Sequence, residues 1–338
     1  MSRTNDRACD NPIEVESPDR PTDGTEGSRL LASRRAALGC MAWAGAGVLW
    51  TLSGGVPRSL GLIGEAEAAQ KAAGAFTFVQ ISDTHVGFNK EANPDVIGTL
   101  RHAIADVNAL NPRPAFVLHT GDVSHLSKPE EFAQARDVLQ ELKVDRIHFI
   151  PGEHDTLDNG MEGFLKVFAR GDGGPGWYSF DQNGVHFVGL VNVIDLQPKS
   201  LAKLGNEQLE WLENDLKGLK SSTPIVVFAH IPLWTVYEPW GWGTADATQA
   251  LSYLKRFGSV TVLNGHIHQV IQKVEGHVSF HTARSTAFPQ PKPGEAPAPG
   301  PMKVAAGELG KVLGTRSVNV VPGKRRLALV DTPLDRAV

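Results

Sequence analysis

The chain has 338 residues, of which 41% are hydrophobic, and its formal net charge is −4. This length allows one large α/β domain or two small ones, and the mild negative charge without a basic stripe argues against a general nucleic-acid-binding surface. Both cysteines, Cys9 and Cys40, lie early in the chain, which excludes disulfides, thiolate metal sites and a cysteine nucleophile from the region after residue 69.

Residues 1–69 are predicted to be a disordered leader that ends in a twin-arginine export signal. The first half of this segment is polar and rich in Asp, Glu, Pro and Gly. Arg34 and Arg35 come next, and a weakly apolar run to Leu52 and the small-residue cleavage pattern at 66–70 follow them. We therefore expect the twin-arginine export machinery as a partner. The protein would be periplasmic or secreted, or membrane-anchored if the signal is not cleaved.

After the leader, short apolar runs alternate with amphipathic patterns. The first half predicts strands 76–83, 115–122 and 146–150, with helices 94–110 and 129–143 between them. Further on, Asn183-Gly184 predicts a hairpin with a type I′ turn within 176–191. The rest predicts helices 205–219 and 248–258, and strands 223–232, 260–268, 277–287 and 325–334. Residues 288–322 are predicted to be a loop or insertion, because 288–302 are rich in Pro, Gly and Ala.

The order of these elements predicts a single α/β domain over residues 70–338. The initial strand–helix alternation is typical of a largely parallel sheet, while the hairpin adds antiparallel pairing. We therefore expect two packed mixed sheets with helices on the outside. The sequence leaves the oligomeric state open.

Five of the predicted strands end in carboxylate or imidazole side chains. The ends read "SDTHVG", "TGDVSH", "PGEHD", "FAHIP" and "NGHIH". They carry Asp83, His85, Asp122, Glu153, His154, His230, His266 and His268. In α/β sheets, ligands bind at the carboxyl ends of the strands. So many ligand-type side chains at one rim indicate that cations balance their charge there.

The ordered set resembles the calcineurin-like metallophosphoesterase superfamily, whose pattern is D-x-H, G-D, G-N-H-[DE], a lone H and G-H-x-H. The resemblance extends from Phe76 to His268, and "QISDTH" and "GHIHQ" are similar to the bacterial class III cyclic-nucleotide phosphodiesterase branch. It implies a four-layer α/β/β/α sandwich and hydrolysis of a small phosphoester, a phosphodiester foremost, by two metal ions. The alternatives are a phosphomonoesterase or nucleotidase, and a catalytically weakened metal-binding protein of the same fold.

The resemblance also implies roles for individual residues. Asp83, His85, Asp122 and His268 would hold one metal, and Asp122 would bridge to a second metal held by Glu153, His230 and His266. Nitrogen and oxygen ligands without thiolate suit divalent or trivalent Fe, Mn or Zn. A hydroxide shared by the metals would attack phosphorus. His154 would protonate the leaving oxygen, and Asp155 would orient its imidazole.

Two features depart from that pattern or add to it. Glu153 stands where the family has Asn, which lowers the net charge of the centre from about +1 to about 0 and predicts weaker activity on highly charged monoesters or a different metal preference. His125 stands where relatives often carry an acidic residue or a ligating Tyr, and is a candidate substrate contact or extra ligand. Beyond His230, the aromatic residues Trp234, Tyr237, Trp240 and Trp242 are candidates for a wall against a flat group or, alternatively, for simple loop packing.

Overall fold

The computed structural model describes residues 50–53, 56–59, 74–157, 160–169, 174–194, 196–324 and 327–335. The chain divides into two compact units, residues 1–65 and 66–338. In the first unit, β1 (Trp50–Ser53) pairs with β2 (Val56–Ser59) in an antiparallel ladder. The predicted twin-arginine pair and the cleavage pattern lie outside the described residues. Within the described ranges, no helix is both long and apolar enough to cross a membrane.

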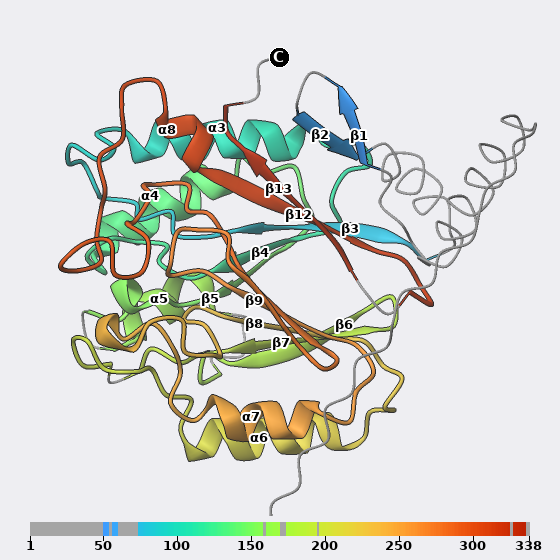
Figure 1. Ribbon diagram of the computed structural model, residues 1–338. Helices are drawn as coiled ribbons and strands as arrows, with labels where there is room; N and C mark the ends of the chain where they lie inside the picture. The colour runs from blue at the N-terminus through green and yellow to red at the C-terminus, as the bar shows by residue number, and fades with distance from the viewer. Residues whose placement is uncertain are drawn as a thin grey trace, which may run out of the picture. The chain divides into compact units, whose positions relative to one another are not determined.

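The second unit contains two mixed sheets (Figure 1). The first has five strands in the order β13 (Ala328–Pro333), β12 (Gly314–Val320), β3 (Phe76–Ile81), β4 (Val117–Thr120) and β5 (Ile147–Ile150). The second has six, in the order β10 (Gln272–Glu275), β11 (Val278–Thr282), β9 (Val260–Asn264), β8 (Ile225–Ala229), β7 (Val185–Leu190) and β6 (Tyr178–Gln182). In the six-stranded sheet, the central pairs are parallel and the pair at each edge is antiparallel. In the five-stranded sheet, β3, β4 and β5 are parallel, and β12 and β13 add antiparallel pairs. Both sheets are therefore mixed, as predicted.

The two sheets pack face to face, and helices cover both outer faces (Figure 1). Helices α3 (Val96–Asn108) and α4 (Pro129–Leu139) cover the five-stranded sheet, and α6 (Asn206–Lys217) and α7 (Ala247–Leu254) cover the six-stranded one. Buried Phe78, Phe187 and Phe228 belong to the core between the sheets. The result is the expected α/β/β/α sandwich. Shorter helices are α5 (Glu162–Phe168), α8 (Leu309–Val312) and the 3₁₀ turns Glu153–Asp155 and Glu238–Trp240.

Local sequence signals account for many of these elements. Helix α3 buries every third or fourth residue, including Val96, Leu100 and Val107, and the Asp95 side chain accepts the N–H of Gly98 at its start. In the hairpin, Asn183 and Gly184 both have positive φ, 48° and 79°, as a type I′ turn requires.

The predicted loop or insertion at 288–322 is wrong in its last third. Residues 288–302 contain no helix or strand, but α8 and β12 follow, and β12 lies between β3 and β13. The strand was not predicted because it contains Arg316, and a charged residue argues against a buried strand. Its guanidinium is fully buried, and it donates to Asp331, to Gln80 and to the carbonyl of Thr282. Paired in this way, the charge is tolerated inside the sandwich.

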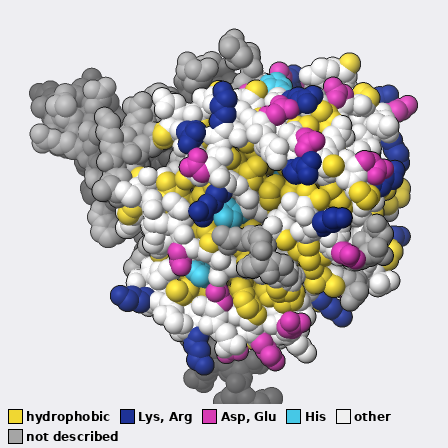
Figure 2. Space-filling view, turned by 180° about the vertical axis from the view of Figure 1, so that it is seen from behind, with side chains coloured by type: hydrophobic (Ala, Val, Ile, Leu, Met, Phe, Trp, Pro, Cys, Tyr) yellow, Lys and Arg dark blue, Asp and Glu magenta, His cyan; other side chains and the backbone are white. Residues whose placement is uncertain are grey.

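Charges of both signs are distributed over the surface. On the face shown in Figure 2, Lys and Arg side chains alternate with Asp and Glu, and apolar side chains lie among them. Mixed charges of this kind favour solubility without producing a strong field of one sign.

Candidate metal centre

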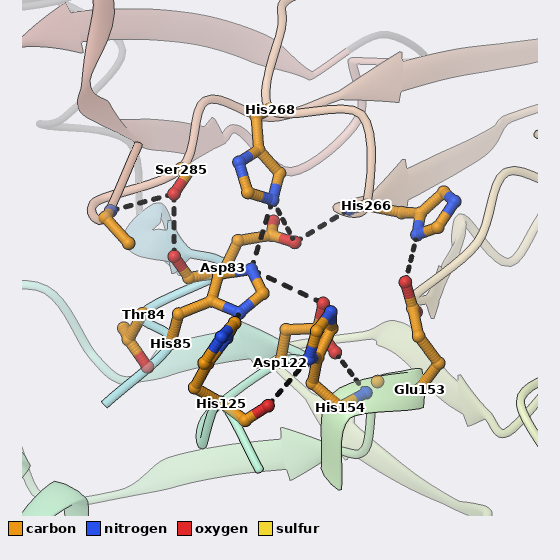
Figure 3. Close-up of polar contacts among 12 residues, drawn as sticks. Asp83, Thr84, His85, Asp122, His125, Glu153, His154, His266, His268 and Ser285 are labelled. Carbon is orange, nitrogen blue, oxygen red and sulfur yellow. Dashed lines mark hydrogen bonds and ion pairs between the residues drawn. The ribbon is translucent and has the colours of Figure 1, made fainter. Parts of the chain in front are cut away.

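The candidate ligands come from the loops that follow β3, β4, β5, β8 and β9. Because β3, β4 and β5 run parallel to one another, as do β8 and β9, each group of strands ends on one rim. Figure 3 shows Asp83, His85, Asp122 and His268 close together, with Glu153 and His266 in contact beside them. The structure thus brings together all seven predicted ligands and His154, although they are spread over 186 positions of the chain, from 83 to 268.

The backbone at the centre is unusual. Five of the seven candidate ligands have left-handed φ values: Asp83 54°, His85 40°, Asp122 53°, His266 66° and His268 58°. For residues other than Gly this conformation costs on the order of 1 kcal/mol or more each, so the surrounding contacts must impose it. Backbone N–H groups of Asp83 and His85 donate to the carbonyls of Gly121 and Asp122 and hold the first two loops together.

Glycines allow these loops to approach one another. A Cβ on Gly121 would lie 2.5 Å from Nδ1 of His230, and one on Gly152 would collide with the Asp122 carboxylate. One on Gly265 would meet the Asp83 carboxylate at 2.7 Å. At these points a side chain would displace a candidate ligand.

The first group of ligand atoms consists of Asp83, His85 and His268, all buried. Nε2 of His268 lies 3.2 Å from Oδ1 of Asp83 and 3.3 Å from Nε2 of His85. The Nδ1–H of His268 donates to the carbonyl of Phe288 at 2.5 Å, which leaves Nε2 with its lone pair directed into the centre.

The second group consists of Glu153, His230 and His266. The two carboxylate oxygens of Glu153 divide between the histidines: Oε2 lies 2.9 Å from Nε2 of His230, and Oε1 lies 2.8 Å from Nδ1 of His266. The Nδ1–H of His230 donates to the carbonyl of Thr120 at 2.7 Å, so its Nε2 also faces the centre.

Asp122 lies between the two groups. Its Oδ2 is 3.5 Å from Nε2 of His85 in the first group and 3.3 Å from Nε2 of His230 in the second. Its Oδ1 accepts the backbone N–H of His154 at 2.9 Å, which fixes the orientation of the carboxylate. A single oxygen is therefore within reach of both ligand groups.

The ligand atoms fit metal ions better than they fit one another. Among the described residues, nine buried side-chain atoms have no hydrogen-bond partner, and four of them belong to candidate ligands: Oδ2 of Asp83, Oε2 of Glu153, Nε2 of His230 and Nδ1 of His266. Buried polar atoms without partners cost on the order of 1–3 kcal/mol each. The Nε2 atoms of His85 and His268 also face each other at 3.3 Å, an arrangement that a metal ion bound to both nitrogens would explain. The donor set is nitrogen and oxygen only, which suits first-row transition metals.

The electrostatics also favour positive charge here. Burial alone would lower the pKa of His230, but the carboxylates of Asp122 and Glu153 outweigh it and raise that pKa well above its ordinary value. Burial would raise the pKa of Glu153, yet the charges of His266 and His230 hold it well below its usual range. The pKa of His85 is lowered by burial and by neighbouring His154. The carboxylates thus favour a positive charge beside them, which a proton on His230 supplies here and a metal ion would replace, whereas His85 is held in the neutral form that binds metal.

His154 lies beside the first group. Its ring contacts that of His85 edge-on at 4.8 Å between centroids, and its Nδ1–H donates to the carbonyl of His125 at 2.7 Å. Nε2 is then the nitrogen available to a substrate. Burial lowers the pKa of His154, but Asp122, Glu153 and the His125 carbonyl together raise it above its ordinary value.

The predicted role of Asp155 as the residue that orients His154 is wrong. The carboxylate points away from the imidazole, because the 3₁₀ turn directs it back under the strand ends. There it accepts the backbone N–H groups of Val123, Ser124 and Gly152 at 2.7–3.0 Å, and also the Ser124 hydroxyl. Burial and nearby Asp122 raise its pKa to about 7. Asp155 joins two ligand loops, and the His125 carbonyl orients the imidazole.

His125 and two of the four predicted aromatic residues, Trp240 and Trp242, line the cavity beside the centre. The His125 ring stacks on His154 at 5.0 Å, and its Nδ1 lies 3.5 Å from Nδ1 of His85. Trp240 lines the cavity, but Trp234 packs on Phe280 of the six-stranded sheet, and Tyr237 packs against Trp240. Trp234 and Tyr237 therefore make the loop-packing contacts that were the alternative to an aromatic wall.

Sequence reasoning missed two contributors from the Pro-rich segment 288–302. The Phe288 ring lies 4.6 Å from the ring of His85 and 4.8 Å from that of His268. The Gln290 amide donates to the carbonyl of His266 at 2.7 Å, and its oxygen accepts the N–H of Gly300 at 3.1 Å. The only available signal was the position of this segment after the H-x-H pair.

Comparison with known proteins agrees with this geometry. Residues 76–270 match the family described as Calcineurin-like phosphoesterase. A curated protein of Arcobacter nitrofigilis named "Probable glycerophosphodiester phosphodiesterase GpdQ" is 27% identical, and the match covers 61% of this chain and 77% of that protein. A 3′,5′-cyclic-nucleotide phosphodiesterase of Nostoc sp. is 25% identical over 63% of this chain and 79% of its own length. A mouse (Mus musculus) serine/threonine-protein phosphatase is 28% identical over 58% and 70%.

Solved structures show the same fold. A dimetal phosphatase of Danio rerio superposes with a TM-score of 0.53 at 18% identity, over 76% of this chain and 98% of its own. A purple acid phosphatase of yellow lupin (Lupinus luteus) superposes with a TM-score of 0.54 at 13% identity, over 77% of this chain and 52% of its own.

Proposed function

The chain belongs to the calcineurin-like phosphoesterase family, and on this premise we propose that it hydrolyses small phosphodiesters with two metal ions and His154 as the general acid. The family and its named relatives make it a metal-dependent phosphoester hydrolase. The observation that carries the proposal is the position of Asp122, whose Oδ2 lies 3.3–3.5 Å from a ligand nitrogen of each group. One carboxylate oxygen within reach of both groups is what a pair of closely spaced ions requires.

The ligand groups would each hold one ion, and Fe, Mn and Zn suit the N/O donor set. Bound ions supply polarisation of the phosphoryl oxygens and a water nucleophile that ionises near neutral pH. The protein holds the ligands in place through the second nitrogens of His230 and His268, each bonded to a backbone carbonyl. The Asp122 carboxylate, the ligand that both ions would share, accepts the backbone N–H of His154 and so fixes the general acid beside the centre.

His154 is suited to give a proton to a leaving oxygen. Its Nδ1–H is committed to the His125 carbonyl, so in the imidazolium form Nε2–H faces the cavity. Its raised pKa increases the protonated fraction at neutral pH. General-acid catalysis contributes most when the leaving group is a strongly basic alkoxide and least when it is a stable phenolate.

A diester fits the charge of this centre better than a monoester. Asp83, Asp122 and Glu153 contribute three carboxylates, one more than the family pattern with Asn provides. A diester carries one negative charge, whereas a monoester carries up to two. The additional carboxylate therefore disfavours the monoester more. Two of the relatives are also named as phosphodiesterases.

The test combines metal analysis of the full-length protein with a leaving-group comparison. We expect about two ions per chain and loss of hydrolysis after chelation, with recovery when divalent ions are restored. His154→Gln should lower kcat by about 100-fold or more for a diester with an alkoxide leaving group, and far less for a p-nitrophenyl diester. His102→Gln, on the exposed surface of α3, serves as the matched control. Equal losses for both leaving groups would contradict the acid role, and a metal-independent activity would contradict the whole proposal.

We also propose, from the sequence pattern alone, that the twin-arginine machinery exports the protein to the periplasm or beyond. The supporting features are Arg34-Arg35, the weakly apolar run after them and the small-residue pattern at 66–70. Cell fractionation of the native chain and of an Arg34→Lys/Arg35→Lys variant tests this. The native protein should be found outside the cytoplasm and the variant inside, and cytoplasmic retention of both would contradict it.

A further inference from the structure

A cavity extends beyond the candidate metal centre. It has a volume of about 590 Å³, and His85, Asp122 and Glu153 line one end of it. Cavities of roughly 300–1,000 Å³ hold ligands of drug-like size. This cavity therefore has room for much more than a phosphoryl group, and its remaining walls contact whatever the phosphorus carries.

Those remaining walls are mainly apolar. Away from the imidazoles and carboxylates, they include Leu157, Met161, Ile194, Leu196, Trp240 and Trp242. Among the described lining residues, Lys199 is the only Lys or Arg, and its side chain is exposed. Sites that bind nucleotides with several phosphates usually provide several cationic or backbone donors. These walls match an uncharged group instead.

The apolar surface continues to the mouth of the cavity. Leu157 and Ile194, which line it, are 60% and 39% exposed. Leu126 and Met302, also exposed, directly follow the lining residues His125 and Pro301. Single exposed apolar side chains are ordinary, but several around one opening indicate a surface that binds apolar groups.

His154 and Trp242 contact different ligand groups of the centre. The ring of Trp242 is 6.1 Å from that of His266 in the second ligand group, while His154 is 4.8 Å from His85 in the first. A diester has two alcohol groups. With the leaving alcohol at His154, the other alcohol extends toward the tryptophans and the apolar walls.

We propose that the cavity binds the retained alcohol of a phosphodiester, and that this alcohol is an uncharged, apolar chain. The inference rests on the proposed diesterase function and adds the substrate class. The metal centre binds the single charge of the diester, and the apolar chain of the substrate leaves water to contact Trp240, Ile194 and Leu196. Attack by water breaks the bond to the leaving alcohol, which takes a proton from His154, and the product is a monoester of the apolar alcohol.

The experiment uses methyl, butyl and octyl p-nitrophenyl phosphate, below the concentration at which the octyl ester aggregates. The leaving group is constant, so only the retained alcohol changes. Each fully buried methylene is worth up to about fourfold in binding. Because the cavity is open, we expect kcat/KM to rise at least about tenfold from methyl to octyl, mainly through a lower KM. The p-nitrophenyl ester of thymidine 5′-phosphate should rank below the octyl ester.

Variants test whether these walls cause the effect. Ile194→Ser and Leu196→Ser should each reduce the octyl-to-methyl ratio at least about threefold, and neither side chain is fully buried, so both positions should tolerate a polar residue. Val274→Ser, at a 65% exposed position on β10, is the control and should keep the native ratio. Hydrolysis of the methyl ester without a rise toward octyl, or a rise that both cavity variants retain, would overturn this inference and leave the diesterase proposal standing. If none of the esters is hydrolysed by the metal-loaded protein, both proposals are wrong.

Discussion

Replacement of Glu153 by Asn tests the charge argument most directly. Glu153 is the one candidate ligand that departs from the family pattern, and its carboxylate contacts both His230 and His266 within 3 Å. With two divalent ions and a shared hydroxide, Asp83, Asp122 and Glu153 leave a net charge of about 0. Glu153→Asn keeps an oxygen ligand, on a side chain one methylene shorter, and raises that net charge to about +1.

The expected magnitude follows from Coulomb's law. Two unit charges 4 Å apart interact by about 1 kcal/mol in water and about 4 kcal/mol at an effective dielectric constant of 20. The Glu153 side chain is 24% exposed, so an intermediate value of about 1.5–3 kcal/mol applies. A monoester dianion carries one more charge than a diester. The monoester-to-diester ratio of kcat/KM should therefore rise at least about tenfold in the variant.

The assay compares p-nitrophenyl phosphate with bis(p-nitrophenyl) phosphate at pH 8, where the monoester is a dianion. Metal content is measured on the same samples, so that a change in loading is not mistaken for a change in charge. Glu275→Gln, at a fully exposed position on β10, is the control and should leave the ratio unaltered. An unchanged ratio in a fully loaded Glu153→Asn protein would refute the electrostatic reasoning.

Three further substitutions probe features that support the centre. Gly152→Ala, at an ordinary φ of −102°, places a Cβ against the Asp122 carboxylate; metal analysis should show partial loss of bound ions, and full loading would contradict the contact. Asp155→Asn replaces an oxygen that accepts backbone N–H groups with a donor, so denaturant unfolding should show a loss of about 2 kcal/mol; an unaltered midpoint would contradict it. For His186, burial lowers the pKa but its bonds to carboxylates, including Asp215, raise it above 6.5 overall. This stabilisation is therefore complete below about pH 6.5 and is lost as pH rises through the folded-state pKa. His186→Asn should cost about 1 kcal/mol more at pH 5.5 than at pH 9, and a pH-independent cost would contradict the assignment.

Much of the fold could be predicted, because most elements carry a local periodic signal. The strands that lead to the centre are short apolar runs, and the helices show clear apolar faces. Strand β12 could not be predicted in the same way, because Arg316 becomes compatible with burial only through Asp331, Gln80 and Thr282, which come from other strands. Pairing of that kind depends on tertiary structure.

The candidate site shows the same division. The chemical type of the side chains and their positions at strand ends were enough to predict that the seven ligands and His154 lie together, because parallel strands end on one rim. The direction in which each side chain points was harder to predict. Asp155 follows His154 directly, but the 3₁₀ turn points the two side chains to different neighbours. Trp234 and Trp240 are six positions apart in one loop, and only the folded backbone decides which of them faces the cavity.

The attachment of segment 288–302 has a consequence for how this scaffold can be altered. The carbonyl of Phe288 accepts the ring Nδ1–H of His268, and the Gln290 side chain joins the carbonyl of His266 to the backbone N–H of Gly300. The same segment provides Pro299 and Pro301 to the cavity. Shortening or exchanging it to admit another substrate would at the same time release two histidines from their tethers. A redesign of substrate selectivity must therefore supply another acceptor for the His268 ring and another donor to the His266 carbonyl. Without them, we expect metal binding to weaken together with the original substrate preference.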